Sequence, residues 1–411
     1  MSTDPEEETG SWLRRYLDAD RAVGYALAMR CWQFPAGLVT AVLVAFCFTP
    51  QVQGLYYTAA TLLGLQTLLH LGLHWVIIHF ASHEWAELEL DRHRRVVGDD
   101  VARQRLAGLL RVFTRWFIVV GLLFGLVVGV LGAWLFFRET DGGSWFFPWC
   151  GLVFFASASL ALSPYIAIME GCQQVLAVHR VSFYRAVTGS LAVWGAMLSG
   201  VGLWALVAAT FVQVAWELYL IGGSYRLFFA SLRAVPARLD WKRELWPLQW
   251  RIGAQSISGF FAFYLFTPVM FAYHGAEVAG QMGMSWNILS NIQQAAFAWI
   301  RTRAPYYGQL IARGEYGRLD QTFFRGFLVS LSAMSIAYGV FLACVFGLSY
   351  MPIGWMESLS RRLLDPTTLL VLAAGLVLIH VARCLAVYLR AHKRDPLLRI
   401  VVVANVMISV A

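Results

Sequence analysis

The sequence is poor in charge. Only 14% of its residues are Asp, Glu, Lys or Arg, whereas soluble domains carry about 25%. The deficit extends along the whole chain, which excludes a soluble domain held by a single anchor. The polar residues 1–24 contain no basic segment followed by a short apolar run, so we expect no cleavable signal peptide.

Motifs of soluble enzymes and of metal sites are also missing. No P-loop occurs, so we expect no ATP hydrolysis by this chain and no cofactor. The cysteines are scattered without a CxxC pair or any metal-ligand spacing, and we interpret them as small hydrophobic residues inside helices. They are Cys31, Cys47, Cys150, Cys172, Cys344 and Cys384.

Long apolar runs are what the sequence has instead: 59% of the residues are hydrophobic. A helix needs about 20 apolar residues to cross a bilayer. Ten runs meet this length, and an eleventh begins near Leu397 and reaches Ala411. The ten predicted spans are residues 25–49, 54–80, 112–137, 145–170, 183–201, 203–222, 246–272, 279–300, 324–348 and 367–389.

The basic residues are divided unequally between the two sides that these spans define. Of the 32 Lys and Arg residues, 26 lie in the N-terminal segment and in every second loop, three lie in the alternate loops, and three lie inside spans. Positive residues accumulate in cytoplasmic loops. We therefore predict a cell inner-membrane protein with a cytoplasmic N-terminus, residues 92–111 in the cytoplasm and residues 141–144 outside. The same pattern explains the net charge of +8 without nucleic acid as a partner.

The two halves of the chain share short matches about 220 residues apart. Phe48-Thr49-Pro50 matches Phe266-Thr267-Pro268, and the second and eighth spans both begin near a glycine, Gly54 and Gly280. Repeats of six spans insert with the same orientation, an arrangement known from transporters.

The sequence therefore predicts an all-α transmembrane bundle of two six-helix lobes related by a pseudo-two-fold axis. Its expected segments are a cytoplasmic tail (1–24), an N-lobe of helices one to six (25–222), a cytoplasmic linker (223–245) and a C-lobe (246–411). Because the last run is shorter than about 20 residues, we expect the rest of helix eleven and all of helix twelve to lie beyond Ala411.

Four predicted helices carry polar residues at helical spacing. Steps of three, four and seven place each set on one face, and polar residues in apolar spans usually face a cavity or the bundle interior. We predict that the first two helices of each half enclose one polar cavity, although hydrogen bonds between helices are the alternative explanation. The lining residues are Arg30, Gln33, Gln66, His70, His74, Arg251, Gln255, Asn287, Asn291 and Gln294.

Charged groups inside spans allow two interpretations. Arg30 and Arg251 lie at matching depths and could bind phosphate or extend to the headgroups, whereas for Arg383 we favour the second. Glu170 and Glu217 lie near span ends, where pairing with loop arginines is the expected role, and ion coupling is a second possibility for Glu217. The i, i+4 spacing of His70 and His74 suits a metal, but no Cys or carboxylate nearby completes a site, so we predict none.

Two stretches, residues 48–88 and residues 282–320, resemble membrane proteins of polysaccharide biosynthesis of the O-antigen flippase type. Their sequences are FTPQVQGLYYTAATLLGLQTLLHLGLHWVIIHFASHEWAEL and MGMSWNILSNIQQAAFAWIRTRAPYYGQLIARGEYGRLD. These proteins belong to the multidrug/oligosaccharidyl-lipid/polysaccharide (MOP) exporter superfamily.

The resemblance implies a non-enzymatic flippase that moves a polyprenyl-pyrophosphate-linked oligosaccharide from the inner to the outer leaflet by alternating access. It implies a central cavity lined by helices one, two, seven and eight, with a polysaccharide polymerase and chain-length machinery as candidate partners. The first predicted helix departs from the pattern of drug exporters. Many drug exporters carry an Asp in this helix, whereas this chain has Arg30 there and no carboxylate. A cation-coupled multidrug antiporter, or a ligase or acyltransferase of envelope glycan assembly with His274 as its candidate side chain, are the alternatives.

Overall fold

The computed structural model describes residues 5–70, 73–139, 143–236, 266–301, 303, 306–307, 310–311, 313–350 and 360–391. These residues are almost all helical, and six of their helices are long and apolar enough to cross a membrane. The predicted all-α membrane fold is therefore confirmed. The chain divides into two compact units, each described separately: unit 1 comprises residues 1–33 and 62–260, and unit 2 comprises residues 34–61 and 261–411. Residues 34–61, placed in the N-lobe by the sequence, thus belong to unit 2 by their contacts.

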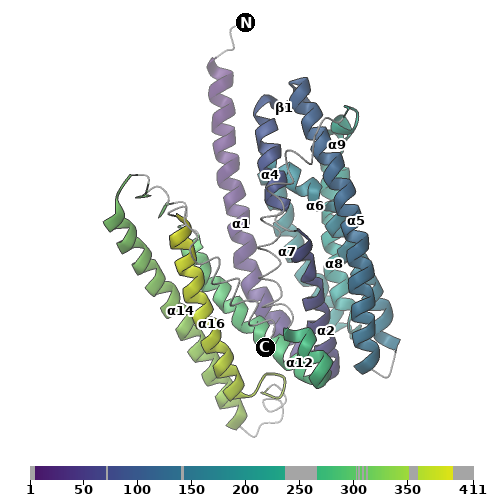
Figure 1. Cartoon of the computed structure of the whole chain (residues 1–411), viewed down its shortest axis with the longest axis vertical. Coiled ribbons are helices and arrows are strands. Elements are labelled where there is room, and N and C mark those ends of the chain that lie inside the picture. Colours follow the sequence, from purple (N-terminus) through teal and green to yellow (C-terminus); the bar gives the residue numbers. More distant parts are fainter. Residues whose placement is uncertain are drawn as a thin grey trace. The chain divides into compact units, whose positions relative to one another are not determined.

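Unit 1 is a bundle in which α6 packs against α4, α5 and α8, and α7 packs against α8 (Figure 1). Its helices are α3 (Leu65–His70), α4 (Leu73–Glu84), α5 (Asp100–Glu139), α6 (Phe146–Gly171), α7 (Val175–Leu198), α8 (Trp204–Leu218) and α9 (Arg226–Arg233). Short 3₁₀ turns, Trp85–Glu87 and Gly143–Trp145, and a π-helical turn, Tyr219–Ser224, join them. Helix α1 (Pro5–Cys47) contributes to both units, so the polar N-terminal segment is helical from Pro5.

Unit 2 is built from α12 (Phe266–Arg301), α14 (Tyr316–Tyr350) and α16 (Pro366–Ala391), which pack against one another. It also contains most of α2 (Pro50–Leu63). Helix α12 bends at Gly275, whose φ of 84° and ψ of 176° are not helical. Helix α16 begins at an Asp-Pro pair, where hydrogen bonds from Thr367 and Thr368 lower the pKa of Asp365 to about 2.

Three sequence predictions are corrected. The second predicted span, residues 54–80, is not one helix, because a turn at Gly64 separates α2 from α3, and glycine weakens a helix interior. Four of the arginines predicted in the following loop are helical, because α5 begins at Asp100. Arg185 is likewise no loop residue, since α7 begins at Val175 and places it three turns inside a helix.

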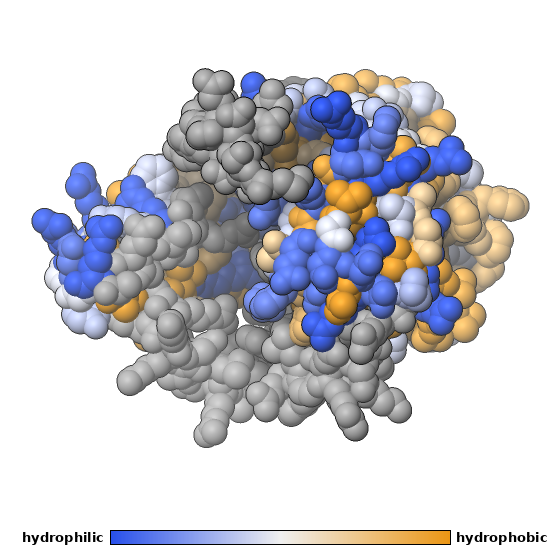
Figure 2. All heavy atoms as spheres, turned by 90° about the horizontal axis from the view of Figure 1, so that it is seen from above, coloured by the Kyte–Doolittle hydropathy of each residue, from blue (hydrophilic) through white to orange (hydrophobic). Residues whose placement is uncertain are grey.

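The loop after α4 contains a small antiparallel hairpin that the sequence did not predict. Strands β1 (Leu88–Leu90) and β2 (Val96–Gly98) pair around a turn in which the Asp91 carboxylate accepts backbone hydrogen bonds from His93 and Arg95. Ser231 of α9 accepts a hydrogen bond from the backbone of Val96. Figure 2 views this end of unit 1 and shows hydrophilic residues gathered on it, with hydrophobic side chains on the flank.

Close helix contacts depend on glycine in both units. Gly121, Gly125 and Gly129 form a GxxxGxxxG face on α5 directed at α6, and a Cβ on Gly121 would lie 2.9 Å from the carbonyl oxygen of Ser157. Small residues at this spacing let membrane helices approach closely. In unit 2 the two glycines matched by the repeat meet directly, since a Cβ on Gly280 would lie 2.9 Å from the nitrogen of Gly54.

This contact predicts that Gly54→Ala destabilises unit 2. The new Cβ would lie 1.8 Å from the carbonyl oxygen of Ala276, and backbone on both sides must then move apart. We expect reduced abundance and a lower unfolding temperature in detergent. Gly339→Ala in α14 is the matched control, because nothing lies within 4 Å of its Cβ. Equal abundance and equal unfolding temperature of Gly54→Ala and Gly339→Ala would contradict the close contact at Gly54.

The predicted orientation is tested by cysteine labelling at the two ends of α5. Gly98 is unsuitable, since its φ is 128° and a Cβ would lie 2.4 Å from the oxygen of Glu87. His93 and Ser144 are exposed at opposite ends of α5, so His93→Cys and Ser144→Cys are introduced after removal of the native cysteines. An impermeant thiol reagent added to intact cells should label only Ser144→Cys. Labelling of His93→Cys instead would reverse the orientation.

Candidate functional site

A polar cavity of about 410 Å³ lies inside unit 1. Two residues predicted from the sequence, Gln66 and His74, line it together with polar side chains of α6, α7 and α8. These additional residues are Ser159, Ser163, Glu170, Ser182, Arg185, Gln213 and Glu217. The sequence stripe of the second predicted helix therefore faces a cavity, and this cavity lies within one unit.

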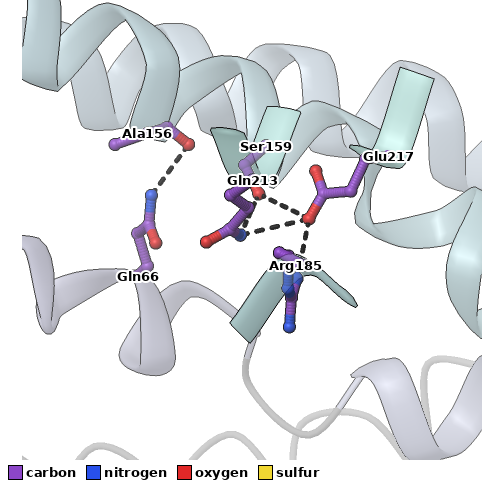
Figure 3. A network of polar contacts seen from close by, with 6 residues as sticks. All are labelled: Gln66, Ala156, Ser159, Arg185, Gln213 and Glu217. Atoms are coloured by element: carbon purple, nitrogen blue, oxygen red, sulfur yellow. Dashed lines mark hydrogen bonds and ion pairs between the residues drawn. The ribbon is translucent and has the colours of Figure 1, made fainter. Parts of the chain in front are cut away.

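Glu217 is the most buried charged group of this cavity, with 6% of its surface exposed. Its Oε1 accepts hydrogen bonds from Ser159 Oγ at 3.1 Å, Arg185 Nη1 at 3.2 Å and Gln213 Nε2 at 3.1 Å (Figure 3). Gln213 Nε2 also donates to Ser159 Oγ at 2.6 Å. Glu217 therefore pairs with an arginine, but this arginine lies in helix α7 and not in a loop as the sequence predicted.

The second carboxylate oxygen of Glu217 is different. Oε2 is buried and has no hydrogen-bond partner among the described residues. An unmatched carboxylate oxygen in an apolar helix is costly, and it leaves Glu217 able to bind a proton or a small cation. Arg185, with 35% of its side chain exposed, reaches the same cavity from α7.

His74 and Glu170 form a second polar contact at the cavity wall, with 3.2 Å between Nε2 and Oε2. Among the described residues, Glu170 contacts a histidine from α4 rather than the loop arginine that the sequence predicted. Gln66 Nε2 donates to the carbonyl oxygen of Ala156 at 2.7 Å, which fixes the start of α3 against α6.

Unit 2 contains a polar cavity of its own, with a volume of about 380 Å³. Asn287 and Gln294, both predicted from the sequence, line it, and the aromatic rings of Tyr57, Phe266 and Trp286 form part of its wall. Asn291 donates to Asn287 Oδ1 at 3.0 Å and lies against Gly37, whose Cβ would be 3.2 Å from the amide nitrogen.

Arg383 is the only charged residue among the described lining residues of this second cavity. Its Nη1 donates to Gln293 Oε1 at 3.1 Å, and Gln293 Nε2 donates to the carbonyl oxygen of Leu376 at 2.8 Å. The buried amide thus holds the guanidinium from α12. The interpretation of Arg383 as a headgroup-directed side chain missed this contact, because Gln293 lies 90 residues away in sequence.

The structure describes only some of the remaining predicted site residues, so it does not test whether they come together. Arg30 and Gln33 are exposed on α1, and Arg30 lies inside the apolar window Gly24–Cys47. Arg251 and Gln255 lie outside the described residues, as does the side chain of His70. Since each unit is described separately, the predicted cavity between the two halves stays a prediction.

A cavity of about 1020 Å³ adjoins the hairpin of unit 1. Arg94, in the turn, lies 5.0 Å from the ring centroid of Tyr225, whose hydroxyl donates to Gln174 at 2.9 Å. Burial raises the pKa of Tyr225, and the nearby Arg94 and Arg180 oppose this shift. No group of three His, Cys, Asp or Glu side chains in the described residues is placed to hold a metal.

Comparison with known proteins gives structural similarity alone. No protein-family model matches the sequence, and no curated protein matches it significantly. An outward-facing structure of a multidrug resistance MATE family transporter of the MOP superfamily is similar, with a TM-score of 0.47 and 11% identity over 96% of this chain and 93% of the other. An inward-facing structure of such a transporter has a TM-score of 0.48 and 14% identity over 94% of this chain and 91% of the other. A MOP superfamily transporter from Pyrococcus furiosus Vc1 (DSM3638), described as having a binding pocket of reversed polarity, has a TM-score of 0.48 and 11% identity over 96% of this chain and 94% of the other.

The unit 1 network predicts an asymmetric effect of neutralising its ion pair. Arg185→Gln leaves the buried Glu217 without its counter-charge, which costs about 3–5 kcal/mol for a buried pair. Glu217→Gln should cost less, because Arg185 is 35% exposed. The double variant Arg185→Gln/Glu217→Gln should regain part of the stability that Arg185→Gln loses. The unfolding free energies in detergent of the unchanged protein, the two single variants and the double variant measure the coupling between the two charges.

Asp100→Asn is the matched control for this cycle. It removes a pair with Arg103 in which the Asp100 side chain is 75% exposed, and such surface pairs contribute about 0–1 kcal/mol. Strictly additive effects of Arg185→Gln and Glu217→Gln would show that the two charges do not interact.

Proposed function

We propose that the chain is a transporter of the MOP exporter superfamily that moves a polyprenyl-pyrophosphate-linked oligosaccharide from the inner to the outer leaflet by alternating access. The observation that carries the proposal is the cavity of unit 2. It combines one arginine, several amides and aromatic rings, and its described lining contains no carboxylate.

This combination suits a phosphorylated sugar. A pyrophosphate carries at least two negative charges, which are expensive to remove from water unless cations meet them. A guanidinium stays charged in a partly dry cavity and binds phosphate oxygens through two parallel hydrogen bonds. Amides such as Asn287 and Gln294 can donate to and accept from sugar hydroxyls.

Arg30 supports the same assignment from α1. It is an exposed guanidinium inside an apolar window, where a charged residue is expensive unless it serves a cavity or reaches the interface. In the proposal, Arg30, Arg251 and Arg383 bind the pyrophosphate as it enters and crosses the protein. Gln33, Gln255, His70 and Asn291 contact the sugars or the phosphate.

A second candidate function has one observation in its favour. The carboxylates of Glu170 and Glu217 in the unit 1 cavity, with Glu217 Oε2 unpartnered among the described residues, would suit coupling to a cation in a multidrug antiporter. Arg185 opposes this, since a fixed guanidinium already contacts Glu217 and repels cationic drugs. Efflux of a quaternary ammonium dye, driven by a proton or sodium gradient, would favour the antiporter.

The proposal is tested in cells that depend on the chain for glycan export. Deleting the gene should make a cytoplasm-facing lipid-linked glycan accumulate, and unchanged lipid precursors would refute the flippase assignment. Arg30→Ala, Arg251→Ala and Arg383→Ala should each restore little export at normal abundance. Loss of one partner from a desolvated charge pair costs about 2–5 kcal/mol, which weakens binding at least about thirtyfold.

Lysine variants and a control variant distinguish arginines that bind the pyrophosphate from arginines that only help the helices insert into the membrane. Arg→Lys at the same positions should stay clearly impaired, because an ammonium cannot bind phosphate bidentately. If the arginines only extend to the headgroups, Lys will be tolerated and Ala will reduce abundance instead. Arg92→Ala, at an exposed position of the hairpin turn, should leave export unchanged.

A further inference from the structure

We propose that unit 2 holds an anionic phospholipid of the bilayer in two adjoining cavities along α12 and α14, with the phosphate on Arg303 and Arg325 and one acyl chain in an apolar groove. This site is separate from the polar cavity around Arg383, and it does not depend on the proposed transport function.

The first of these cavities, the basic pocket, has a volume of about 500 Å³. Its charged lining residues are two arginines, and the described lining contains no carboxylate. The lining residues are Trp299, Arg303, Gln321, Thr322, Arg325 and Val329. Residues 321, 325 and 329 recur every four positions, so they share one face of α14. Two guanidiniums beside neutral hydrogen-bonding groups bind a phosphate and disfavour a cation.

The position of Arg303 is fixed by its surroundings. Its guanidinium carbon lies 5.0 Å from the ring centroid of Trp299, which is a cation–π contact. Its backbone donates to the carbonyl oxygen of Ile300 at 3.1 Å and accepts from the nitrogen of Tyr307 at 3.1 Å. The guanidinium therefore does not have to be ordered when a ligand binds.

A buried hydroxyl without a partner lies at the same place. Tyr307 is fully buried, and its hydroxyl has no hydrogen-bond partner among the described residues. A Cβ on Gly326 would lie 3.6 Å from this hydroxyl and 3.6 Å from Arg303 Nη1, so both groups approach one point beside Arg325. Tyr307 is not among the described lining residues of the basic pocket, so its hydroxyl marks a buried polar group next to Arg303 and is not itself a contact of the proposed ligand.

The second cavity, the apolar groove, has a volume of about 240 Å³ and shares Trp299 and Val329 with the basic pocket. Its wall consists mostly of apolar side chains, among them Phe34, Ile292, Ala295, Ala333, Met334 and Ala337. The polar Ser330 is already engaged, because it donates to the carbonyl oxygen of Ala296 at 2.7 Å and contacts His380 at 3.0 Å. Nothing else in the described lining of this groove suits a polar ligand.

The continuity of a basic pocket with an apolar groove points to an amphiphile with an anionic head. Free phosphate would leave the groove empty, and an acidic peptide would bring backbone polar groups into it. Trp299, at the junction, belongs to the residue type that concentrates at membrane interfaces. The pocket lies at the basic-loop end of α12 and α14, which we predict to be cytoplasmic, and the cytoplasmic leaflet is rich in anionic lipids for which basic pockets between helices are binding sites.

The test uses the purified full chain in a neutral detergent, with phosphatidylglycerol or phosphatidylcholine added. Native mass spectrometry should detect retained phosphatidylglycerol, and its apparent dissociation constant should be at least tenfold lower than that of phosphatidylcholine. The variant R303Q/R325Q should raise the constant for phosphatidylglycerol at least tenfold and change that for phosphatidylcholine less, because the choline cation already offsets its phosphate. Ala333→Phe should weaken both lipids by filling the groove. Arg318→Gln, an exposed arginine of α14 outside the pocket, is the control.

Several outcomes would overturn the site. Equal binding of the two lipids would show that the pocket does not select an anionic head group. If Arg318→Gln weakened phosphatidylglycerol as much as R303Q/R325Q does, the preference would come from general charge attraction. If inorganic phosphate alone displaced phosphatidylglycerol and Ala333→Phe had no effect on binding, no acyl chain would occupy the apolar groove. Preferential retention of a polyprenyl phosphate would assign the pocket to the cargo. Since Arg325 is exposed, Arg325→Gln alone supplies a folded variant if the double change lowers abundance.

Discussion

Every charged side chain that enters an apolar helix of this chain has to be compensated inside the protein or directed to water. The hydrocarbon region supplies no hydrogen bonds, so an unmatched charge there is costly. Glu217 illustrates the constraint, because one carboxylate oxygen collects three donors from three helices. Those donors bring α6, α7 and α8 together around a single point.

The two units meet this constraint around groups of opposite charge, a carboxylate in unit 1 and a guanidinium in unit 2. In unit 1 a buried carboxylate is met by a half-exposed arginine, so the cavity contains both charges. In unit 2 the Arg383 guanidinium is met by the neutral amide of Gln293, and no described lining residue of its cavity carries a negative charge. The anionic substrate that we propose would supply a counter-charge there. This difference connects the packing of each unit with the chemistry that each cavity can perform.

Close packing in both units depends on glycine at several helix contacts, in addition to large buried side chains such as Phe117 and Phe271. Lipid chains are as apolar as leucine, so helices in a membrane gain little from burying leucine against each other. The GxxxGxxxG face of α5 and the meeting of Gly54 with Gly280 let backbones approach instead. Large apolar residues such as Leu122, Leu126 and Phe137 remain exposed on α5, as expected for a surface in contact with lipid.

The sequence by itself determined the all-α membrane class, most helix positions and the residues with polar faces, since apolar length and helical spacing are local properties. It also indicated that Glu217 pairs with an arginine. Only the tertiary structure decided that Gln66 and His74 face Glu170 and Arg185 within unit 1. It likewise assigned Arg383 to a cavity through Gln293, and it revealed the hairpin and the break at Gly64. These features depend on backbone turns or on contacts between residues 90 or more positions apart, and neither hydropathy nor spacing records which distant face a side chain meets.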